Sequence, residues 1–538
     1  MEKWRRDFAL CVEDWRTYWG KYRRLAVCFG LIVGIVYGGY ICSGSFFLDS
    51  EIMAIRPEFM RDVWLGSNRF GMVATSLLFG LGRLNPWLSN ILMGLVMWAC
   101  ALFLSFSSFC WTGGERRYRF FYGCFPALFL TAPVFVEQYL FVLQSFEISV
   151  GMFLTLAAAY CSDRSCRRGG NWHTLAGLFF LVWALGTYQA FAPMYLSLAL
   201  AAFLLRCLTD GGMRGFSYGL RQAGFFLAAC LLYLTAAVLV REGSGVQSDY
   251  IGNMIRWKTD GTAAALAAIQ DHVLQIMMAA RVFFRPYYLP AMALCVLQAL
   301  CYGWKEKAGK GFGWFVFGGG LLLLSPFYMT FLTGGVQPIR TQFAYPVTAA
   351  LFLAHLTVAP RQEEARERIN GQKKAGRAVR MLPVLMTGVC LFCAARQGRD
   401  TAQLFQTAGE AYRNDVLTAN RMYPDICRAA GAVDMKQCSV IFIGGRDAGI
   451  QGPALYGELA GKSFFGAEAH VPGGVSSRLG GLFPILGMDL KVEPENVDAY
   501  FQAVEYMKDA PDWPAEGSIR KMGGTVVVRL SGDVSQGT

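Results

Sequence analysis

The chain has 538 residues, of which 54% are hydrophobic and only 16% are charged, and its mean hydropathy is +0.35. Soluble domains average about 25% charged residues, so the composition excludes an ordinary soluble protein and indicates a polytopic membrane protein. The net charge of +12 lies in short basic clusters between apolar segments. That distribution is typical of membrane topology and argues against a nucleic-acid-binding surface.

The first 24 residues precede the first apolar segment. They carry seven Lys and Arg residues, and no small-residue cleavage site follows a short apolar region. A cleaved signal peptide would need a short apolar region followed by a cleavage site with small residues. We therefore expect residues 1–24 to form a cytoplasmic N-terminal segment.

Eleven apolar segments follow, each long enough to be interpreted as a transmembrane helix. Basic segments such as "GGERRYR" and "DRSCRRGG" each follow an even number of these spans, whereas the intervening turns "TAPVFVEQ" and "GTYQAFAP" contain no Lys or Arg. Because positive residues favour the cytoplasmic side, we expect a cytoplasmic N-terminus and a transmembrane domain over residues 25–396. The approximate bounds of the spans are 25–45, 86–108, 119–135, 145–161, 173–187, 190–207, 218–240, 287–303, 312–332, 340–359 and 379–396.

Two segments on the outer side, residues 46–85 and 241–286, are longer than turns, and we expect juxtamembrane helices in both. In the second, apolar residues recur at helical spacing, which predicts an amphipathic helix lying in the membrane interface. The apolar residues at this spacing are Leu266, Ile269, Val273, Ile276, Ala280 and Phe283.

An odd number of spans places residues 397–538 outside as well. This tail combines the helical pattern "DTAQLFQTAGEAYRNDVLTANRM" with the strand-like runs "CSVIFIGG" and "GTVVVRL", which predicts a small α/β domain. Cys427 and Cys438 lie in it, and the sequence leaves open whether they form a disulfide. The expected fold class is an all-α polytopic membrane protein of about eleven transmembrane helices with a small C-terminal extracytoplasmic α/β domain.

Two acids, Asp49 and Glu51, stand directly outside the first span in "GSFFLDSEIMAIR". A carboxylate at this position can act as general base on a sugar hydroxyl beside a lipid-borne substrate. Outer loops also contain ordinary acids, so the pair alone does not define a site.

Further polar side chains converge on the same outer side. Outer loops should be poor in Arg, so Arg69, Arg285 and Arg340 indicate an anionic ligand such as a phosphate. Polar and aromatic residues at outward span ends are candidates for sugar or acceptor contact, with lipid-headgroup contacts, an aromatic belt and wet loops as the alternatives. These candidates are Trp64, Glu137, Gln138, Glu147, Tyr188 and Gln189.

Three short motifs carry a resemblance to a known family: "LDSE" after the first span, "WLGSNRFG" downstream, and "TYQAF" at a later outward end. Together they resemble the multispanning GT-C glycosyltransferases, and in particular the bacterial O-antigen glucosyltransferases of the Gtr type II family. The resemblance covers about residues 25–360. Many members have two adjacent Asp where this chain has Asp49, Ser50 and Glu51, which leaves open which acid is the base.

The resemblance implies a multi-pass enzyme of the bacterial cytoplasmic membrane. Such enzymes take a hexose such as glucose from a polyprenyl-phosphate carrier, for instance undecaprenyl phosphate, and transfer it to a lipid-linked or surface glycan on the extracytoplasmic face. Asp49 would be the base of an inverting single displacement, and Glu51 would orient the acceptor or share that role. The leaving phosphate would be bound by Arg69, Arg285 and Arg340. No cofactor is expected, although Glu51 stays open as a ligand of a divalent metal.

Other classes of function fit the sequence less well. A transporter or flippase of polyprenyl-linked glycans predicts polar residues near mid-membrane and an internal repeat, whereas the informative residues here lie at outer ends. A surface-polysaccharide polymerase or ligase does not require acids directly after the first span. A non-catalytic scaffold leaves the outward arginines unexplained.

Overall fold

The structure is a computed structural model, and it describes residues 2–80, 85–168, 171–209, 215–246, 252, 254–305, 310–359, 375–431, 438–492 and 496–531. It is mostly helical and carries one small sheet. The α-helices are α1 (Glu2–Tyr22), α2 (Arg24–Ile41), α3 (Ser50–Ile55), α4 (Pro57–Gly66), α5 (Phe70–Phe79), α6 (Pro86–Trp111), α7 (Phe121–Leu130), α8 (Val134–Tyr139), α9 (Ser145–Arg168), α10 (Asn171–Thr187), α11 (Phe191–Thr209), α12 (Gly215–Ser244), α14 (Arg256–Thr259), α15 (Thr262–Met277), α16 (Tyr288–Lys305), α17 (Lys310–Leu324), α18 (Tyr328–Thr333), α19 (Ala344–His355), α21 (Ala375–Ala430), α22 (Gly474–Ile485) and α23 (Val497–Tyr506). The strands are β1 (Ser439–Ile443), β2 (Lys491–Val492), β3 (Ile519–Met522) and β4 (Thr525–Arg529), and short 3₁₀ turns include η2 (Val142–Gln144) and η4 (Ile339–Thr341).

Seven helical segments among the described residues are long and apolar enough to cross a membrane. They are Arg24–Ile41, Pro86–Trp111, Val142–Arg167, Phe191–Thr209, Gly215–Ser244, Gly313–Thr333 and Met381–Ala430. The predicted spans at 119–135, 173–187, 287–303 and 340–359 fall on the shorter helices α7, α10, α16 and α19. The prediction of a largely helical membrane protein with a small sheet is confirmed, and the count of eleven spans stays a prediction.

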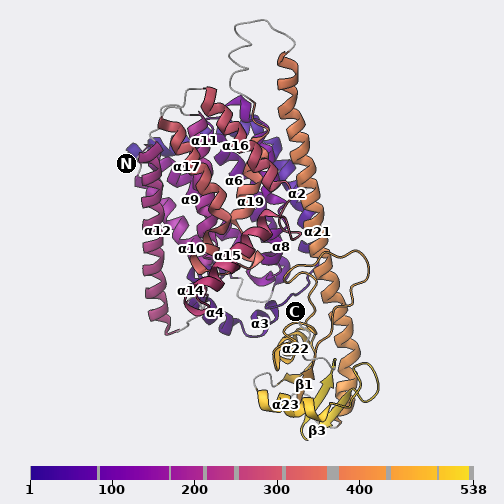
Figure 1. The fold of residues 1–538 in the computed structure, drawn as a ribbon. Helices are drawn as coiled ribbons and strands as arrows, with labels where there is room; N and C mark the ends of the chain where they lie inside the picture. Colours follow the sequence, from indigo (N-terminus) through magenta and orange to yellow (C-terminus); the bar gives the residue numbers. More distant parts are fainter. Residues whose placement is uncertain are drawn as a thin grey trace.

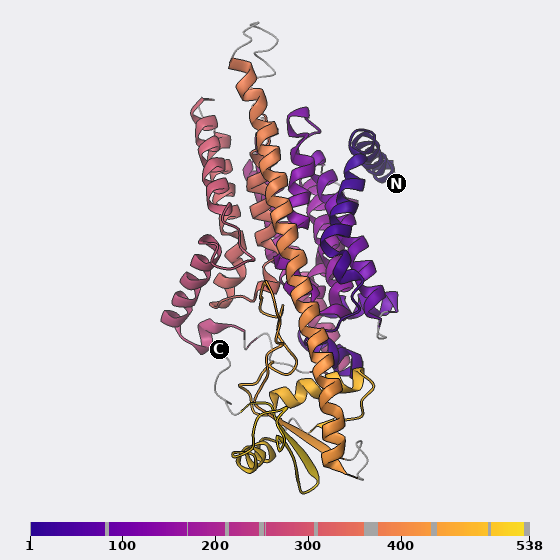
Figure 2. The same cartoon turned by 90° about the vertical axis from the view of Figure 1, so that its right-hand side faces the viewer.

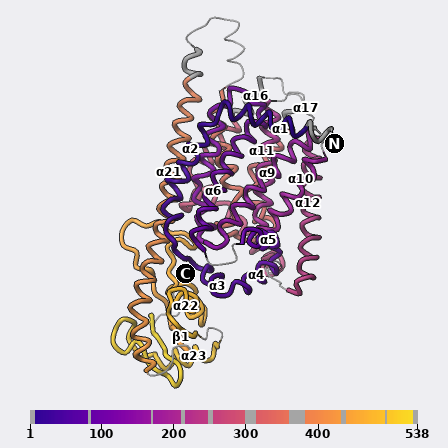
Figure 3. Tube along the Cα trace, turned by 180° about the vertical axis from the view of Figure 1, so that it is seen from behind, coloured from indigo at the N-terminus to yellow at the C-terminus, as the bar shows by residue number. Residues whose placement is uncertain are grey.

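The bundle is built around α9, which packs against α6, α10 and α11 and is largely buried along its apolar length. Helix α12 lies at the edge of the bundle (Figure 1), and most of its apolar length is exposed. A helix that is apolar all round but little covered by protein is suited to contact with lipid. Helix α1 lies across one end of the bundle (Figure 3). At the opposite end, α3 lies close to α22 (Figure 1).

Helix α21 runs the length of the bundle and continues into the C-terminal region (Figure 2). Its 56 residues give a length of about 84 Å at 1.5 Å per residue. Phe405, halfway along it, stacks on Tyr40 of α2 with the ring centroids 4.3 Å apart. The domain boundary predicted at residue 397 falls inside this continuous helix. The chain between Pro383 and Pro424 contains no Pro that would break the helix there.

The C-terminal sheet has the strand order β2-β1-β4-β3, with β1 parallel to both of its neighbours and β3 antiparallel to β4. Side chains alternate along β1 as a strand requires: Val440 and Phe442 pack in one core with the end of α21 and with α22, whereas Ile441 and Ile443 pack in another with α23. We call the sheet with α22 and α23 the C-terminal unit. Cys427 and Cys438 are both free thiols.

The structure also contains the expected helix of the second outer segment, which is α15. Ile276 is buried, whereas Leu266, Leu274 and Met278 are exposed. Apolar side chains exposed along one helix are compatible with a position in the membrane interface.

Candidate active site

The acids predicted from the sequence lie where the chain leaves α2 and starts α3. Asp49 caps α3 in a left-handed conformation, with φ at 70°. Ser50 follows it and accepts a hydrogen bond from the backbone N–H of Val142 through Oγ at 3.2 Å. Ser50 and Glu51 are completely buried, whereas the Asp49 side chain is 37% exposed. The two acids therefore have different surroundings, and Asp49 is the accessible one.

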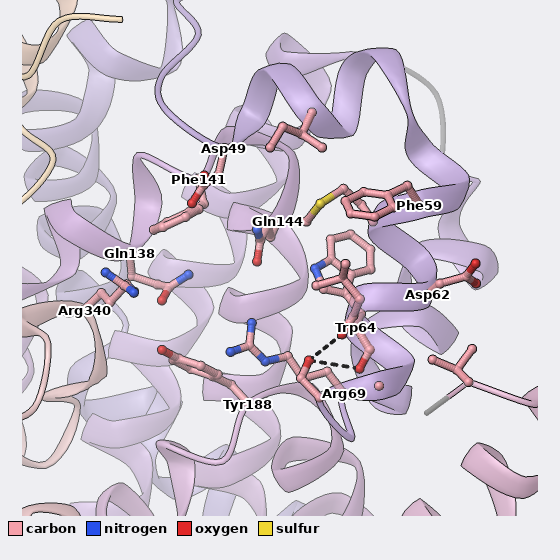
Figure 4. A pocket seen from close by; sticks show the side chains of 16 residues that line it. Asp49, Phe59, Asp62, Trp64, Arg69, Gln138, Phe141, Gln144, Tyr188 and Arg340 are labelled. Atoms are coloured by element: carbon pink, nitrogen blue, oxygen red, sulfur yellow. Dashed lines mark hydrogen bonds between the residues drawn. The ribbon is translucent and has the colours of Figure 1, made fainter. Parts of the chain in front are cut away.

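Asp49 lines a cavity of about 500 Å³ at the end of the bundle that faces the C-terminal unit. Figure 4 shows polar side chains pointing into this space from several elements that are far apart in the sequence. The lining residues with polar or aromatic side chains are Asp49, Phe59, Asp62, Trp64, Ser67, Arg69, Gln138, Phe141, Gln144, Tyr188 and Arg340. Glu51 does not line the cavity.

Arg69 lies on one side of the cavity, at the turn between α4 and α5. Its guanidinium lies 4.7 Å from the centroid of the Tyr188 ring, a cation–π arrangement. Gln189 donates through Nε2 to the carbonyl oxygen of Ser67 at 2.7 Å and to the Tyr233 hydroxyl at 3.0 Å, so it holds the turn that precedes Arg69. Gln189 thus stabilises the turn before Arg69 and does not itself line the cavity.

The glycine of the "WLGSNRFG" motif has a packing role. A Cβ added to Gly71 would lie 2.5 Å from the carbonyl oxygen of Trp183, on α10. Only glycine permits this approach, which brings the start of α5 and its N-cap residue Arg69 against the end of α10. The motif therefore combines Trp64 and Arg69, which line the cavity, with a residue that sets the backbone between them and Tyr188.

Arg340 lies on the opposite wall, in η4 (Figure 4). Its guanidinium is 5.6 Å from the centroid of the Phe141 ring. Gln138 and Gln144 lie on the same side, on α8 and η2, and both are nearly buried. Two guanidinium groups and two carboxamides thus face one cavity, with the carboxylates of Asp49 and Asp62 also on its wall. This arrangement suits an anionic ligand that also needs hydrogen-bond donors.

Besides Glu51 and Gln189, three predicted residues do not line the cavity. Arg285 donates through Nη1 to Asp400 Oδ2 at 2.8 Å, and both side chains are buried. Glu137 is buried and accepts hydrogen bonds from the backbone N–H groups of Leu459 at 2.7 Å and Ala460 at 3.4 Å. Glu147 is fully buried in the first turn of α9. The expected phosphate contact of Arg285 and the expected sugar contacts of Glu137 and Glu147 are therefore not supported by their positions.

Arg478, on α22, contacts both acids and was not predicted from the sequence. Its Nη1 donates to Asp49 Oδ1 at 2.5 Å and to Glu51 Oε1 at 2.8 Å. Burial raises the pKa of Glu51 to about 7, and the neighbouring Arg478 opposes that rise. Nothing in "GGVSSRLGG" resembles a catalytic motif, and no local pattern reports a contact between residues so far apart in the chain.

Three of the four described non-glycine residues with a left-handed backbone lie in or next to the candidate site. The non-glycine residues with positive φ among those described are Asp49, Asn68, Ala279 and Glu468. Asn68 precedes Arg69, and Glu468 accepts a hydrogen bond from Arg478 at 2.6 Å. Such conformations cost about 1–3 kcal/mol each and are common at functional sites, where the surrounding structure holds them.

No group of three or more His, Cys, Asp or Glu side chains in the described part of the chain is arranged to hold a metal ion. The positive charge between Asp49 and Glu51 is supplied by Arg478.

These helices and the sheet define a membrane protein with a polar cavity at one end of its bundle. Residues 41–358, more than half of the chain, match the family described as Glucosyl transferase GtrII, and the chain belongs to this family. It is therefore a membrane glycosyltransferase, and the resemblance predicted from the motifs is confirmed. The matched region contains every residue that lines the cavity, whereas the C-terminal unit lies outside it. Searches of curated proteins and of solved structures find no significant match.

Proposed function

We propose that the protein transfers a hexose, glucose or a close relative, from a polyprenyl-phosphate carrier to a lipid-linked or surface glycan. The observation that carries this proposal is the cavity in which Asp49, Arg69 and Arg340 lie together. A polyprenyl-phosphate sugar has an anionic phosphate next to the anomeric carbon. A cavity that combines two arginines with the accessible carboxylate of Asp49 matches that substrate and its reaction.

We place the reaction on the extracytoplasmic face of the bacterial cytoplasmic membrane, with the N-terminus inside and the C-terminus outside. Helix α9 starts beside the cavity residue Gln144 and ends at a second cavity, of about 350 Å³, whose lining is rich in basic residues. Twenty residues of helix span about 30 Å, the thickness of the hydrocarbon core. The basic residues there are Lys21 of the N-terminal segment, Arg164 and Arg167 of "DRSCRRGG", and Arg206 in the last turn of α11. Their position at the far end from Asp49 supports this orientation under the positive-inside rule.

In the proposed step, Asp49 removes the proton from the acceptor hydroxyl as its oxygen attacks the anomeric carbon. The bond from that carbon to the phosphate oxygen breaks, and the electron pair leaves with the polyprenyl phosphate. The proton ends on the Asp49 carboxylate, and the single displacement inverts the anomeric centre. Asp49 Oδ1 is engaged by Arg478, so Oδ2 is the oxygen we assign to the acceptor.

Arg69 and Arg340 stabilise the charge that develops on the departing phosphate. Fixed cations aimed at developing charge are usually the largest single contribution to catalysis. Gln138 and Gln144 are assigned to hydroxyl groups of the sugar, because carboxamides both donate and accept hydrogen bonds. Trp64 and Tyr188 offer flat apolar faces to the sugar ring. We propose no metal in this step, since the arginines supply the positive charge.

The test is Asp49→Asn in the full chain, reconstituted in nanodiscs with undecaprenyl-phosphate glucose labelled in the sugar and a lipid-linked glycan fraction as acceptor. We expect transfer to fall at least 100-fold, within the range of general-base catalysis, with unchanged insertion and thermal stability. Asp260→Asn is the matched control, because Asp260 is exposed and does not line the cavity. Full transfer by the Asp49 variant would contradict the base assignment. Movement of the labelled lipid across the bilayer without transfer would favour a flippase.

A further inference from the structure

The C-terminal unit reaches the two acids of the candidate site although it lies outside the family match. Arg478 holds Asp49 and Glu51 with Nη1 and Glu468 with Nη2. Its side chain is only 13% exposed. Hydrogen bonds between ionised groups in such a poorly hydrated place are about twice as strong as neutral ones. The Arg478–Glu51 pair is therefore a largely buried interaction and not a surface ion pair.

Local packing is adapted to this contact. A Cβ added to Gly481 would lie 2.4 Å from Glu51 Cγ and 2.9 Å from Glu51 Cβ. Real Cβ atoms do not approach other carbons so closely, so only glycine lets α22 lie this near α3. Arg478 stands one turn before Gly481 on the same helix, and the close approach brings its guanidinium to the acids.

The same part of the chain contacts the other wall of the cavity. Leu459 and Ala460 donate to Glu137, the residue before the cavity residue Gln138. Glu458 Oε2 accepts a hydrogen bond from the backbone N–H of Ile339 at 3.0 Å, one residue before Arg340. The segment between β1 and α22 thus contacts the arginine side of the cavity, whereas α22 itself contacts the acid side.

We propose that the C-terminal unit completes the active site, with Arg478 as a positioning residue that turns the Asp49 carboxylate towards the cavity. The inference rests on the proposed function, because Arg478 acts through Asp49. It means that the region matched by the family is not a complete catalytic unit in this protein.

The groups around Asp49 make the effect of Arg478 measurable. Glu51 and Glu468 are the other acids that share its guanidinium. Helix α4, which packs against α3, carries the charged residues Glu58, Arg61 and Asp62, all exposed, with exposed Arg56 at its start. The adjoining turn η2 contributes the neutral Gln144. Arg478 is the buried cation that contacts Asp49 and fixes one of its oxygens.

The experiment compares kcat and KM for sugar transfer by Arg478→Gln and Arg478→Lys. Misplacement of a catalytic group by about 1 Å can cost about 100-fold in rate. We expect Arg478→Gln to lower kcat by about 10- to 100-fold with little change in the donor KM, and Arg478→Lys to restore part of the rate. Arg529→Gln is the matched control, because Arg529 pairs with Asp512 within the C-terminal unit. It should lower thermal stability and leave kcat unchanged.

Gly481→Ala provides a second route if Arg478→Gln fails to insert, since it moves α22 away from α3 and should also lower kcat. A wild-type kcat in every folded variant would overturn the inference, even when Asp49→Asn is inactive. If Asp49→Asn stays active, the proposed function fails instead. The contact is then judged by a double-mutant cycle on thermal stability between Arg478→Gln and Glu51→Gln, in which additive effects would overturn it.

Discussion

The guanidinium of Arg69 lies over the ring of Tyr188, 4.7 Å from its centroid, although the two residues belong to different turns at the end of the bundle. Arg69 Nε is buried without a hydrogen-bond partner among the described residues. The ring therefore takes part of the role that a carboxylate has in an ordinary ion pair. It orients the cation and leaves its hydrogen-bond donors for a ligand.

Replacing Tyr188 tests this division of roles. Tyr188→Phe keeps the ring, so we expect kcat/KM for the polyprenyl-phosphate sugar to fall less than about threefold. Tyr188→Leu removes the aromatic face, and cation–π interactions contribute about 0.5–2 kcal/mol, which corresponds to a loss of about 2- to 30-fold. Steady-state kinetics with the donor varied at fixed acceptor would measure both. Equal losses in the two variants would show that the hydroxyl, not the ring, matters.

The phosphate assignment predicts a stronger effect at the arginines themselves. Arg69→Ala and Arg340→Ala should each lower kcat/KM for the donor by about 10- to 100-fold, because hydrogen bonds to charged groups contribute about 1.5–3 kcal/mol. The acceptor KM should change little. Arg61→Ala is a suitable control, since Arg61 is exposed on the neighbouring helix α4 and does not line the cavity. An effect confined to the acceptor KM would refute the phosphate role.

Hydropathy and the distribution of basic residues were sufficient to predict a helical membrane protein. They also grouped Asp49, Arg69, Gln138, Tyr188 and Arg340 on one side of it, and these five residues line one cavity. This prediction was possible because side-chain charge and span length act locally along the sequence. The grouping does not require knowledge of how the helices pack.

Contacts that depend on helix packing could not be predicted from the sequence. Arg285 belongs to an outer segment like Arg340, yet the end of the predicted last span brings Asp400 to it. Glu51 stands two residues from Asp49, but the approach of α22 buries one and leaves the other accessible. Arg478 is 427 residues from Glu51. Each outcome follows from tertiary packing that no local pattern encodes.

The Arg285–Asp400 ion pair predicts a stability defect instead of a binding defect. Both side chains are less than a tenth exposed, and removal of one partner from a buried pair costs about 3–5 kcal/mol, because the other charge stays buried. Arg285→Met should therefore lower the melting temperature and the yield while the donor KM of the folded fraction stays unchanged. The double variant Arg285→Met with Asp400→Leu should regain much of the stability. A raised donor KM in folded Arg285→Met would instead indicate that Arg285 contacts the donor phosphate.

The buried carboxyl of Glu137 predicts a dependence of stability on pH. Burial raises its pKa from 4.5 to about 7, against the opposing hydrogen bond from Leu459. Glu137 lies outside the predicted spans. Because the folded state holds its proton more tightly than the unfolded state, this contribution to stability is complete below about pH 4.5. It is lost as the pH rises through about 7.

Glu137→Gln keeps one oxygen that can accept from the N–H of Leu459, loses the weaker acceptor for the N–H of Ala460, and cannot release a proton. The melting temperature of the variant should therefore fall less than that of the wild type between pH 5 and pH 8. A pKa displacement of this size corresponds to at most about 3 kcal/mol. Glu505→Gln is the control, because Glu505 is exposed on α23 and should leave the slope unchanged. Thermal unfolding in one detergent across this pH range measures the difference, and identical slopes for wild type and Glu137→Gln would show that Glu137 is ionised throughout.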